Sequence, residues 1–224
     1  MKLEAILLAA GRGKRLKNKI SKPLIKILSK SILVYSLELF TKEPIIKKII
    51  IVCNSKDISL VKKITKNFKK IKKITLGGKE RRDSVRNALS EVDKDTDLVL
   101  IHDTARPCLK KSDLKKIIKA GIKFQAAVLG VPVKSTIKLK DKNSFVKKTL
   151  PRDFIYEIQT PQIFKKGIIL EAFKKFKNSN FTDDASFVEN IGKKVKIVTG
   201  SYSNIKITTP EDLILAEGIF KKSS

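Results

Sequence analysis

Short runs of hydrophobic residues alternate with amphipathic segments along most of this chain. Compact apolar runs ended by glycine or polar residues are typical of buried strands. We expect such strands at residues 3–8, 48–53, 71–76, 98–101, 126–131 and 195–198. Segments whose apolar residues recur every three or four positions predict helices at 31–40, 57–70, 81–92, 112–120, 165–176, 183–189 and from 210 onward. This alternation predicts an α/β fold with a parallel sheet between two layers of helices.

The stretch from Pro132 to Pro151 departs from that pattern. Residues 136–139 and 144–146 alternate apolar and polar side chains, as an exposed hairpin does. We therefore expect residues 132–151 to form an arm that leaves the sheet. No internal repeat or linker interrupts the chain, and 224 residues fit a single domain over 1–224.

Composition restricts the class of protein. A hydrophobic content of 42% is enough for a packed core and argues against disorder. No apolar run is long enough to predict a membrane span. The first residues lack a signal-peptide pattern, and two cysteines, Cys53 and Cys108, are too few for a disulfide framework. These features predict a cytoplasmic protein.

The formal net charge of +28 favours anionic partners. It allows two interpretations, a nucleic-acid surface or a general enrichment in lysine. Only seven of the 50 basic residues are arginines, and they fall in four short segments outside the lysine-rich helices. Because the planar guanidinium binds phosphate in a way that lysine cannot copy, we take the arginines as the functional signal. Their positions are 12, 15, 81, 82, 86, 106 and 152.

A non-catalytic, basic RNA-binding protein remains the alternative from another class. Against it, the chain has no tryptophan and only three tyrosines, so no set of aromatic residues is available to stack bases. The basic residues are also spread along the chain rather than gathered in one tail.

Polar clusters follow several of the expected strands, where ligands bind in open α/β sheets. In the first cluster, residues 9–15 (AAGRGKR), small residues let backbone N–H groups approach a triphosphate while cations balance its charge. The spacing matches neither the Walker loop nor the dinucleotide fingerprint. Lys22, just before Pro23, adds a further cation, and His102-Asp103 ends another strand.

Six further motifs accompany this opening. They are GGKERRDSV (77–85), IHDTARP (101–107), VPVKSTIK (131–138), PRDFIYEIQTPQIF (151–164), TDDAS (182–186) and NIKITTPEDL (204–213). Together with LLAAGRGKRL and SKPLI, they resemble, in order and over essentially the whole chain, the 2-C-methyl-D-erythritol 4-phosphate cytidylyltransferase family of the non-mevalonate isoprenoid pathway. The resemblance implies a Rossmann-like three-layer nucleotidyltransferase fold with a protruding β-arm. It also implies a homodimer joined through the arm, with CTP, a polyol phosphate and Mg²⁺ as ligands.

The resemblance also implies roles for individual residues. Catalysis would rest on Arg15, Lys22, Arg152 and Lys206, and the metal would be held by Asp103. The nucleotide would be bound by Ala9, Ala10, Gly11, Gly13, Gly78 and Ser84. The polyol phosphate would be bound by Arg106, Thr136, Arg152, Thr160 and Thr182, with Thr136 and Arg152 reaching in from the partner subunit's arm.

These residue types suit the implied chemistry. A phosphate monoester is mostly dianionic at neutral pH, so it needs no general base to act as a nucleophile. The only histidine is His102, and we expect it to be packed or hydrogen-bonded rather than catalytic. Positioning and cations aimed at the α-phosphate then carry the catalysis.

Some features leave alternatives open. Pentitol-phosphate cytidylyltransferases acting on ribitol 5-phosphate share the QTPQ and NIKITTP motifs, although the PVKSTIK segment fits the isoprenoid family better. Lys79, Thr104 and Ser203 differ from the residues usual in that family. Arg81 and Arg82 have the alternative interpretation of surface charges of a helix, and we read Asp183-Asp184 as the acidic start of another helix rather than as ligands.

Overall fold

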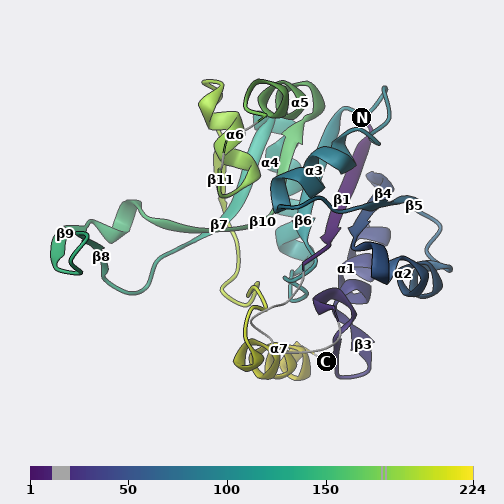
Figure 1. Cartoon of the computed structure of the whole chain (residues 1–224), viewed down its shortest axis with the longest axis horizontal. Coiled ribbons are helices and arrows are strands. Elements are labelled where there is room, and N and C mark those ends of the chain that lie inside the picture. Colours follow the sequence, from purple (N-terminus) through teal and green to yellow (C-terminus); the bar gives the residue numbers. More distant parts are fainter. Residues whose placement is uncertain (12–20, 178, 180, 224) are drawn as a thin grey trace.

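A twisted seven-stranded sheet forms the centre of the computed structural model, which describes residues 1–11, 21–177, 179 and 181–223 (Figure 1). Its strand order is β11-β7-β10-β6-β1-β4-β5, and only β10 runs antiparallel to its neighbours. The strands are β1 (Leu3–Ala9), β4 (Ile46–Cys53), β5 (Ile71–Leu76), β6 (Leu98–Asp103), β7 (Ala126–Pro132), β10 (Tyr156–Lys165) and β11 (Lys196–Thr199). The expected α/β class and mostly parallel sheet are confirmed.

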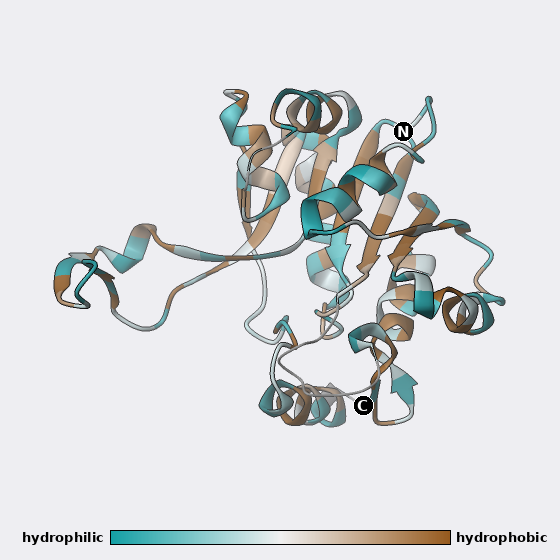
Figure 2. Ribbon diagram, viewed as in Figure 1, coloured by the Kyte–Doolittle hydropathy of each residue, from teal (hydrophilic) through white to brown (hydrophobic). Residues whose placement is uncertain are grey.

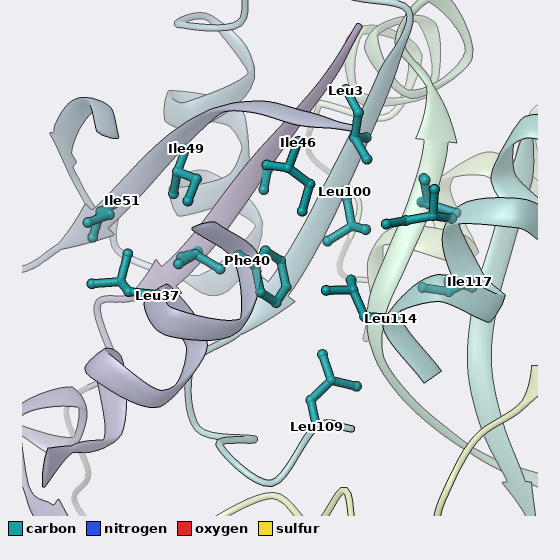
Figure 3. Close-up of a cluster of buried hydrophobic side chains, with 14 of the residues drawn as sticks. Leu3, Leu37, Phe40, Ile46, Ile49, Ile51, Leu100, Leu109, Leu114 and Ile117 are labelled. Carbon is teal, nitrogen blue, oxygen red and sulfur yellow. The ribbon is translucent and has the colours of Figure 1, made fainter. Parts of the chain in front are cut away.

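Helices cover both faces of the sheet because the strands are buried on both sides. Along β1, Leu3 and Leu7 belong to one buried cluster, while Ile6 belongs to another on the opposite face. The first cluster packs under α1 (Ile32–Thr41), α2 (Ile58–Thr65) and α4 (Lys111–Phe124). The second packs under α3 (Arg81–Leu89), α5 (Lys166–Lys175) and α6 (Asp184–Asn190). Figure 2 shows hydrophobic residues concentrated on the central strands, and Figure 3 shows the first cluster, with Phe40 and Ile46 at its centre.

β10 is the one sheet strand that the sequence pattern does not predict. It pairs antiparallel with both β6 and β7, and it contains Pro161, which follows a cis peptide bond. A proline cannot donate a hydrogen bond to the ladder and therefore argues against an internal strand. The β10–β7 register is interrupted between Ile158 and Gln162, so the proline occupies a break in the ladder.

Two smaller differences concern helix ends and a hairpin. α2 ends at Thr65, before the expected limit at residue 70, and Ile71 already begins β5. A short turn η2 (Lys22–Leu24) leads into a hairpin of β2 (Lys26–Ile27) and β3 (Lys30–Ser31), and η3 (Ser55–Asp57) precedes α2. The hairpin packs against α7 (Pro210–Ser223) in a third cluster that includes Ile27 and Ala216.

The expected arm is present. β8 (Ile137–Lys140) and β9 (Val146–Leu150) form a separate antiparallel hairpin, followed by the turn η4 (Arg152–Phe154). The arm projects from the body between β7 and β10 (Figure 1), and the side chains of Phe145 and Phe154 are 72% and 86% exposed. The apolar residues of the hairpin therefore do not fold back onto the body of the same chain.

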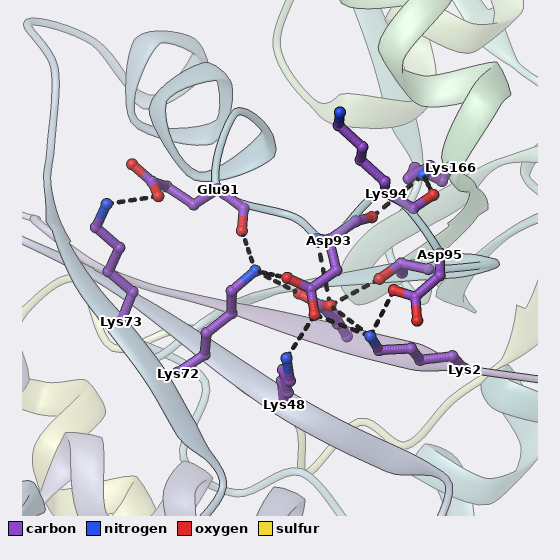
Figure 4. Close-up of polar contacts among 11 residues, drawn as sticks. Lys2, Lys48, Lys72, Lys73, Glu91, Asp93, Lys94, Asp95 and Lys166 are labelled. Carbon is purple, nitrogen blue, oxygen red and sulfur yellow. Dashed lines mark hydrogen bonds and ion pairs between the residues drawn. The ribbon is translucent and has the colours of Figure 1, made fainter.

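At the amino-terminal ends of the parallel strands, a network of charges joins the α3–β6 loop to the sheet (Figure 4). Asp93 in that loop accepts hydrogen bonds from Lys2, Lys48 and Lys72, which precede or belong to β1, β4 and β5. Glu4, which is fully buried, accepts a hydrogen bond from Thr96 at 2.7 Å. This acid–lysine network lies at the opposite end of the strands from the polar clusters described next.

None of the described helices is long and apolar enough to cross a membrane.

Candidate active site

The polar clusters converge at the carboxyl ends of β1, β5 and β6, as expected for an open α/β sheet. They border a cavity of about 300 Å³, which we call the first cavity. Its described lining residues are Leu8, Ala10, Gly11, Lys22, Pro23, Asn54, Gly78, Lys79, Glu80, Arg81, Ser84, Asp103, Thr104, Ala105 and Lys206. The small residues Ala10, Gly11 and Gly78 therefore line the same cavity as the cations Lys22, Arg81 and Lys206.

The turn between β5 and α3 is built by side-chain capping. Glu80 and Asp83 form a reciprocal capping box at the start of α3. The Ser84 hydroxyl accepts a hydrogen bond from the backbone N–H of Gly78 at 3.1 Å. A Cβ placed on Gly78 would lie 2.2 Å from the Cβ of Asp83, so the tight turn leaves no room for any side chain there. Gly78 and Ser84 thus shape this wall of the first cavity.

A second cavity of about 410 Å³ adjoins the first. Its described lining residues are Arg81, Asp103, Arg106, Ile158, Gln159, Thr160, Gln162, Thr182, Asp183, Ser186, Glu189 and Lys206. Arg81, Asp103 and Lys206 line both cavities. These three charged side chains therefore form the boundary at which ligands in the two cavities would meet.

Asp103, the last residue of β6, is held on both carboxylate oxygens. Oδ1 accepts a hydrogen bond from Arg81 Nε at 3.0 Å, and Oδ2 accepts one from Lys206 Nζ at 2.6 Å. Burial by itself raises the pKa of Asp103, but the charges of Arg81 and Lys206 outweigh it and hold the pKa well below its usual range. Asp103 is therefore an ionised carboxylate at neutral pH.

Arg81 connects α3, β6 and α6. Its two terminal nitrogens each donate to an Asp184 oxygen at 2.8 Å, which is a bidentate pair. The Asp184 side chain is 1% exposed and that of Arg81 30%. Our sequence-based interpretation of both residues as surface features of helix ends is incomplete. Arg81 begins α3 but lines both cavities, which together we call the cleft. Asp184 pairs with Arg81, and Asp183 caps α6 by accepting a hydrogen bond from Ser186 N at 3.0 Å.

The two expected catalytic lysines approach the first cavity from different segments. Lys22 Nζ donates to the backbone oxygen of Ile207 at 2.7 Å, and Lys206 Nζ contacts Asp103. Lys22 therefore contacts the segment that carries Lys206, although 184 positions of sequence separate the two lysines. Both cations are within the lining of one cavity.

Thr160 and His102 are fixed by internal hydrogen bonds. The Thr160 hydroxyl accepts a hydrogen bond from the backbone N–H of Asp103 at 3.0 Å and lies 3.2 Å from His102 Nδ1. His102 is fully buried, with its ring 5.2 Å from that of Phe40, and burial lowers its pKa to about 3. A neutral, packed histidine agrees with the expectation that it does not act as an acid or base.

Arg106 and Thr182 both line the second cavity. Arg106 donates to the backbone oxygen of Asn204 at 2.7 Å, while its buried Nε has no hydrogen-bond partner among the described residues. Asn204 in turn donates to Gln159 Oε1 at 3.0 Å. The NIK segment is thereby attached to the β10 residues that line the second cavity.

Not every expected site residue borders the cavities. Arg15 and Gly13 lie outside the described residues. Among the described residues, Ala9 is buried in the first cluster, and Thr136 and Arg152 lie exposed on the arm. The remaining expected residues line one cavity or both: Ala10, Gly11, Lys22, Gly78, Ser84, Asp103, Arg106, Thr160, Thr182 and Lys206.

The described residues contain no group of three or more Asp, Glu, His or Cys side chains that could enclose a metal ion. A single carboxylate, Asp103, instead borders both cavities. Mg²⁺ in nucleotide enzymes is held by one or two carboxylates together with substrate phosphates rather than by a protein cage. The donor set fits Mg²⁺ of that kind.

A mostly parallel α/β sheet, with a glycine-lined cavity and a cationic boundary beyond its strand ends, defines the chain as an enzyme of the nucleotidyltransferase class. The chain belongs to the 2-C-methyl-D-erythritol 4-phosphate cytidylyltransferase (IspD) family, whose family model matches residues 3–222.

Relatives of that name agree with the assignment. The enzyme of Clostridium tetani is 47% identical over 222 residues, covering 97% of this chain and 90% of that protein. The enzyme of Caldanaerobacter subterraneus is 42% identical, covering 99% of this chain and 100% of that protein. The crystal structure of 4-diphosphocytidyl-2C-methyl-D-erythritol synthase from Anaerococcus prevotii matches with a TM-score of 0.89 and 34% identity, covering 98% of this chain and 96% of that one.

Proposed function

We propose that this protein transfers the cytidylyl group of CTP to 2-C-methyl-D-erythritol 4-phosphate, giving CDP-methylerythritol and pyrophosphate. The observation that best supports this reaction is the boundary of Arg81, Asp103 and Lys206 shared by the two cavities. A nucleotide in the first cavity and a phosphate ester in the second would meet there. The membership of the family adds the identity of the substrates.

The reaction is an in-line displacement. A phosphate oxygen of the polyol phosphate attacks the α-phosphorus, and the bond from that phosphorus to the β-bridging oxygen breaks as pyrophosphate leaves. The nucleophile is already anionic, so no proton has to be removed. The main obstacle is the approach of one polyanion to another, and cations placed at the boundary lower it.

The site residues have complementary roles in this proposal. Lys22 and Arg15 stabilise charge on the α-phosphate and the leaving pyrophosphate. Lys206 orients the attacking phosphate, since its side chain is 41% exposed and borders both cavities. Ala10, Gly11 and Gly13 surround the triphosphate. Gly78 and Ser84 shape the pocket for the base.

Asp103 is the residue that would hold Mg²⁺ together with the nucleotide phosphates. When bound, the cation supplies charge neutralisation and Lewis-acid polarisation of the phosphoryl group. The protein contributes the orientation of the carboxylate, which Arg81 fixes at one oxygen.

The second cavity would take the polyol phosphate. Arg106, Thr160 and Thr182 border it directly, and Thr160 also accepts a hydrogen bond from the end of β6. Gln159 and Gln162 add amide groups to its lining that are suited to hydroxyl groups of a polyol. Neither glutamine was among the site residues predicted from the sequence, although both belong to the QTPQ motif.

The arm would join two copies of the chain, so that Thr136 and Arg152 of each copy complete the other copy's second cavity. Two of the exposed apolar side chains of the arm, Phe145 and Phe154, support this proposal because an isolated chain leaves them in water. Replacing both with Ser should convert a dimer to a monomer in sedimentation velocity and reduce turnover. A variant that sediments as the parent does, whether as monomer or dimer, would contradict the arm-mediated dimer.

The assay that tests the reaction measures pyrophosphate release from CTP and Mg²⁺ with methylerythritol 4-phosphate or ribitol 5-phosphate as acceptor. We expect release with methylerythritol phosphate. Release with ribitol phosphate alone would instead assign the chain a pentitol substrate, and release with neither would contradict cytidylyl transfer.

We place the reaction in the cytoplasm, where Cys53 and Cys108, both free and buried, suit a reducing environment.

A further inference from the structure

Arg81 is paired with Asp184, a buried carboxylate to which the proposed chemistry gives no role. Arg81 uses its terminal nitrogens on Asp184 and its Nε on Asp103, so one guanidinium bridges two carboxylates from β6 and α6. Lys206 occupies the other oxygen of Asp103. The four side chains thus form a row of alternating charge: Asp184, Arg81, Asp103 and Lys206.

The order of charges in this row has a consequence for Asp103. With Asp184 absent, Arg81 would have Asp103 as its only described carboxylate partner, and Asp103 would stand between two cations. With Asp184 present, one of the two positive charges beside Asp103 is offset by a carboxylate whose two oxygens both accept hydrogen bonds at 2.8 Å. Asp103 therefore keeps negative charge that is available to another cation.

The geometry also restricts which oxygen of Asp103 can change partner. Oδ1 is bound by Arg81, which is itself held in place by two hydrogen bonds to a side chain only 1% exposed. Oδ2 is bound by Lys206, whose side chain is 41% exposed and lies on a flexible aliphatic stem. The Lys206 contact is the one that an arriving ligand could replace without disturbing the packed interior.

We propose that Arg81 and Asp184 act as a positioning pair: Arg81 fixes the Asp103 carboxylate, and Asp184 offsets the charge of Arg81 so that Asp103 retains affinity for the divalent cation carried by the nucleotide. This inference rests on the proposed function of the cleft. It assigns a role in the reaction to Asp184, a residue that the sequence analysis did not place in the site.

The test is a Mn²⁺ titration of the enzyme with CTP and without the polyol phosphate, so that no turnover occurs. Electron paramagnetic resonance of free Mn²⁺, compared with the same titration of CTP alone, reports the affinity of the enzyme complex. Asp184→Asn keeps the shape of the side chain and removes its charge. We expect it to weaken Mn²⁺ binding about tenfold, the lower end of what loss of an outer-sphere partner usually causes. Excess Mn²⁺ should then restore most of the lost turnover.

The matched control is Asp113→Asn in α4. Asp113 is also a buried aspartate, 3% exposed and paired with a basic residue, Lys116, but it borders neither cavity. We expect this variant to bind Mn²⁺ as the parent does. Asp184→Glu, which keeps the charge, should recover much of the affinity.

Unchanged Mn²⁺ affinity in Asp184→Asn would overturn the positioning pair and leave the proposed reaction intact. If that variant does not fold, Arg81→Lys decides, because lysine keeps the charge but cannot bridge both carboxylates. Lower Mn²⁺ affinity in Arg81→Lys supports the proposal, and parental affinity overturns it. A parent protein that does not bind CTP with Mn²⁺ would count against the proposed function itself.

Discussion

At the scale of single residues, the cleft depends on a few side chains whose charge is set by their neighbours. Lys206 contacts the ionised Asp103, and Lys22 contacts a backbone oxygen of the same segment. Each lysine can form a further ion pair once phosphates arrive, because an ammonium group binds a polyanion strongly. We therefore expect these two lysines to differ from the many exposed lysines in their effect on catalysis.

Replacing Lys22 or Lys206 with Ala should lower turnover by about 100-fold or more, the usual cost of a strong transition-state contact. Steady-state release of pyrophosphate measures it. Lys63→Ala in α2, an exposed residue that lines neither cavity, serves as the control and should behave as the parent. Equal turnover of all three variants would remove both lysines from the site.

His102 gives a prediction about pH and stability. Its pKa is lowered from 6.5 to about 3 in the folded protein by burial, so the unfolded chain binds a proton that the folded chain excludes. The stability due to this neutral histidine is complete above pH 6.5 and is lost as the pH falls toward 3. Between pH 6.5 and about pH 5 the loss should reach about 2 kcal/mol.

Urea unfolding at several pH values measures this loss. His102→Asn cannot take up a proton, so its unfolding free energy should lack that part of the decline, although the variant is less stable overall. The difference between the two curves isolates His102 from the carboxyl groups, which are present in both proteins. Parallel curves would mean that His102 binds a proton equally well in the folded and the unfolded protein.

At the scale of elements, the β5–α3 turn shapes the wall of the first cavity. Its conformation depends on close backbone approach: a Cβ on Gly77 would lie 2.5 Å from the Cβ of Ala10, and one on Gly78 would clash with Asp83. The turn and the first glycine-containing loop therefore pack directly against each other. A substitution that displaces the turn should therefore also displace the loop.

Gly78→Ala should destabilise the protein by about 1–3 kcal/mol, as overpacking does, and should raise the KM for CTP. Gly167→Ala in α5 is the matched control, because nothing lies within 4 Å of the added methyl group. A helical glycine replaced with alanine in open space should leave stability equal or slightly higher. The denaturant midpoint measures the stability of each variant, and steady-state kinetics give its KM for CTP. Equal midpoints and equal KM values for the two variants would contradict the tight turn.

The elements also show what the sequence could predict. Buried strands such as β1 and β4 each contain a compact apolar run, and the ends of these runs locate the clusters of the cleft. β10 was not predicted because Pro161 interrupts its pattern, and Gln159 and Gln162 of the QTPQ motif were not recognised as lining residues, although Thr160 between them was. The pairing of Arg81 with Asp184 joins residues 103 positions apart, and no local pattern indicates such a contact. The arginine count was the one signal that pointed to Arg81.

At the scale of the whole molecule, the net charge of +28 surrounds a cleft whose ligands are anions. Such a field raises the rate of encounter with charged ligands, and salt screens it. The lysines outside the cleft then have a kinetic effect without contacting the substrate. Their effect should appear in kcat/KM, which includes the association of the substrate, and not in kcat.

We expect kcat/KM for the polyol phosphate to fall about three- to tenfold between about 20 and about 300 mM KCl, while kcat changes little. Steady-state kinetics at constant Mg²⁺ measure this dependence. Sucrose at matched osmolarity controls for effects other than screening and should leave kcat/KM nearly unchanged. A salt-independent kcat/KM would show that the surface charge does not assist association.

The acid–lysine network at the amino-terminal ends of the strands makes the chain unequally tolerant of mutation. The sequence has 50 basic residues and 22 acidic ones, so carboxylates are scarce. Asp93 accepts hydrogen bonds from three lysines at once, whereas each of those lysines shares this acceptor with two other lysines. Substitutions of Lys48 should therefore be tolerated, whereas most substitutions of Asp93 should destabilise the fold. Descendants of this chain that gain still more lysine would depend increasingly on the few acidic positions that remain.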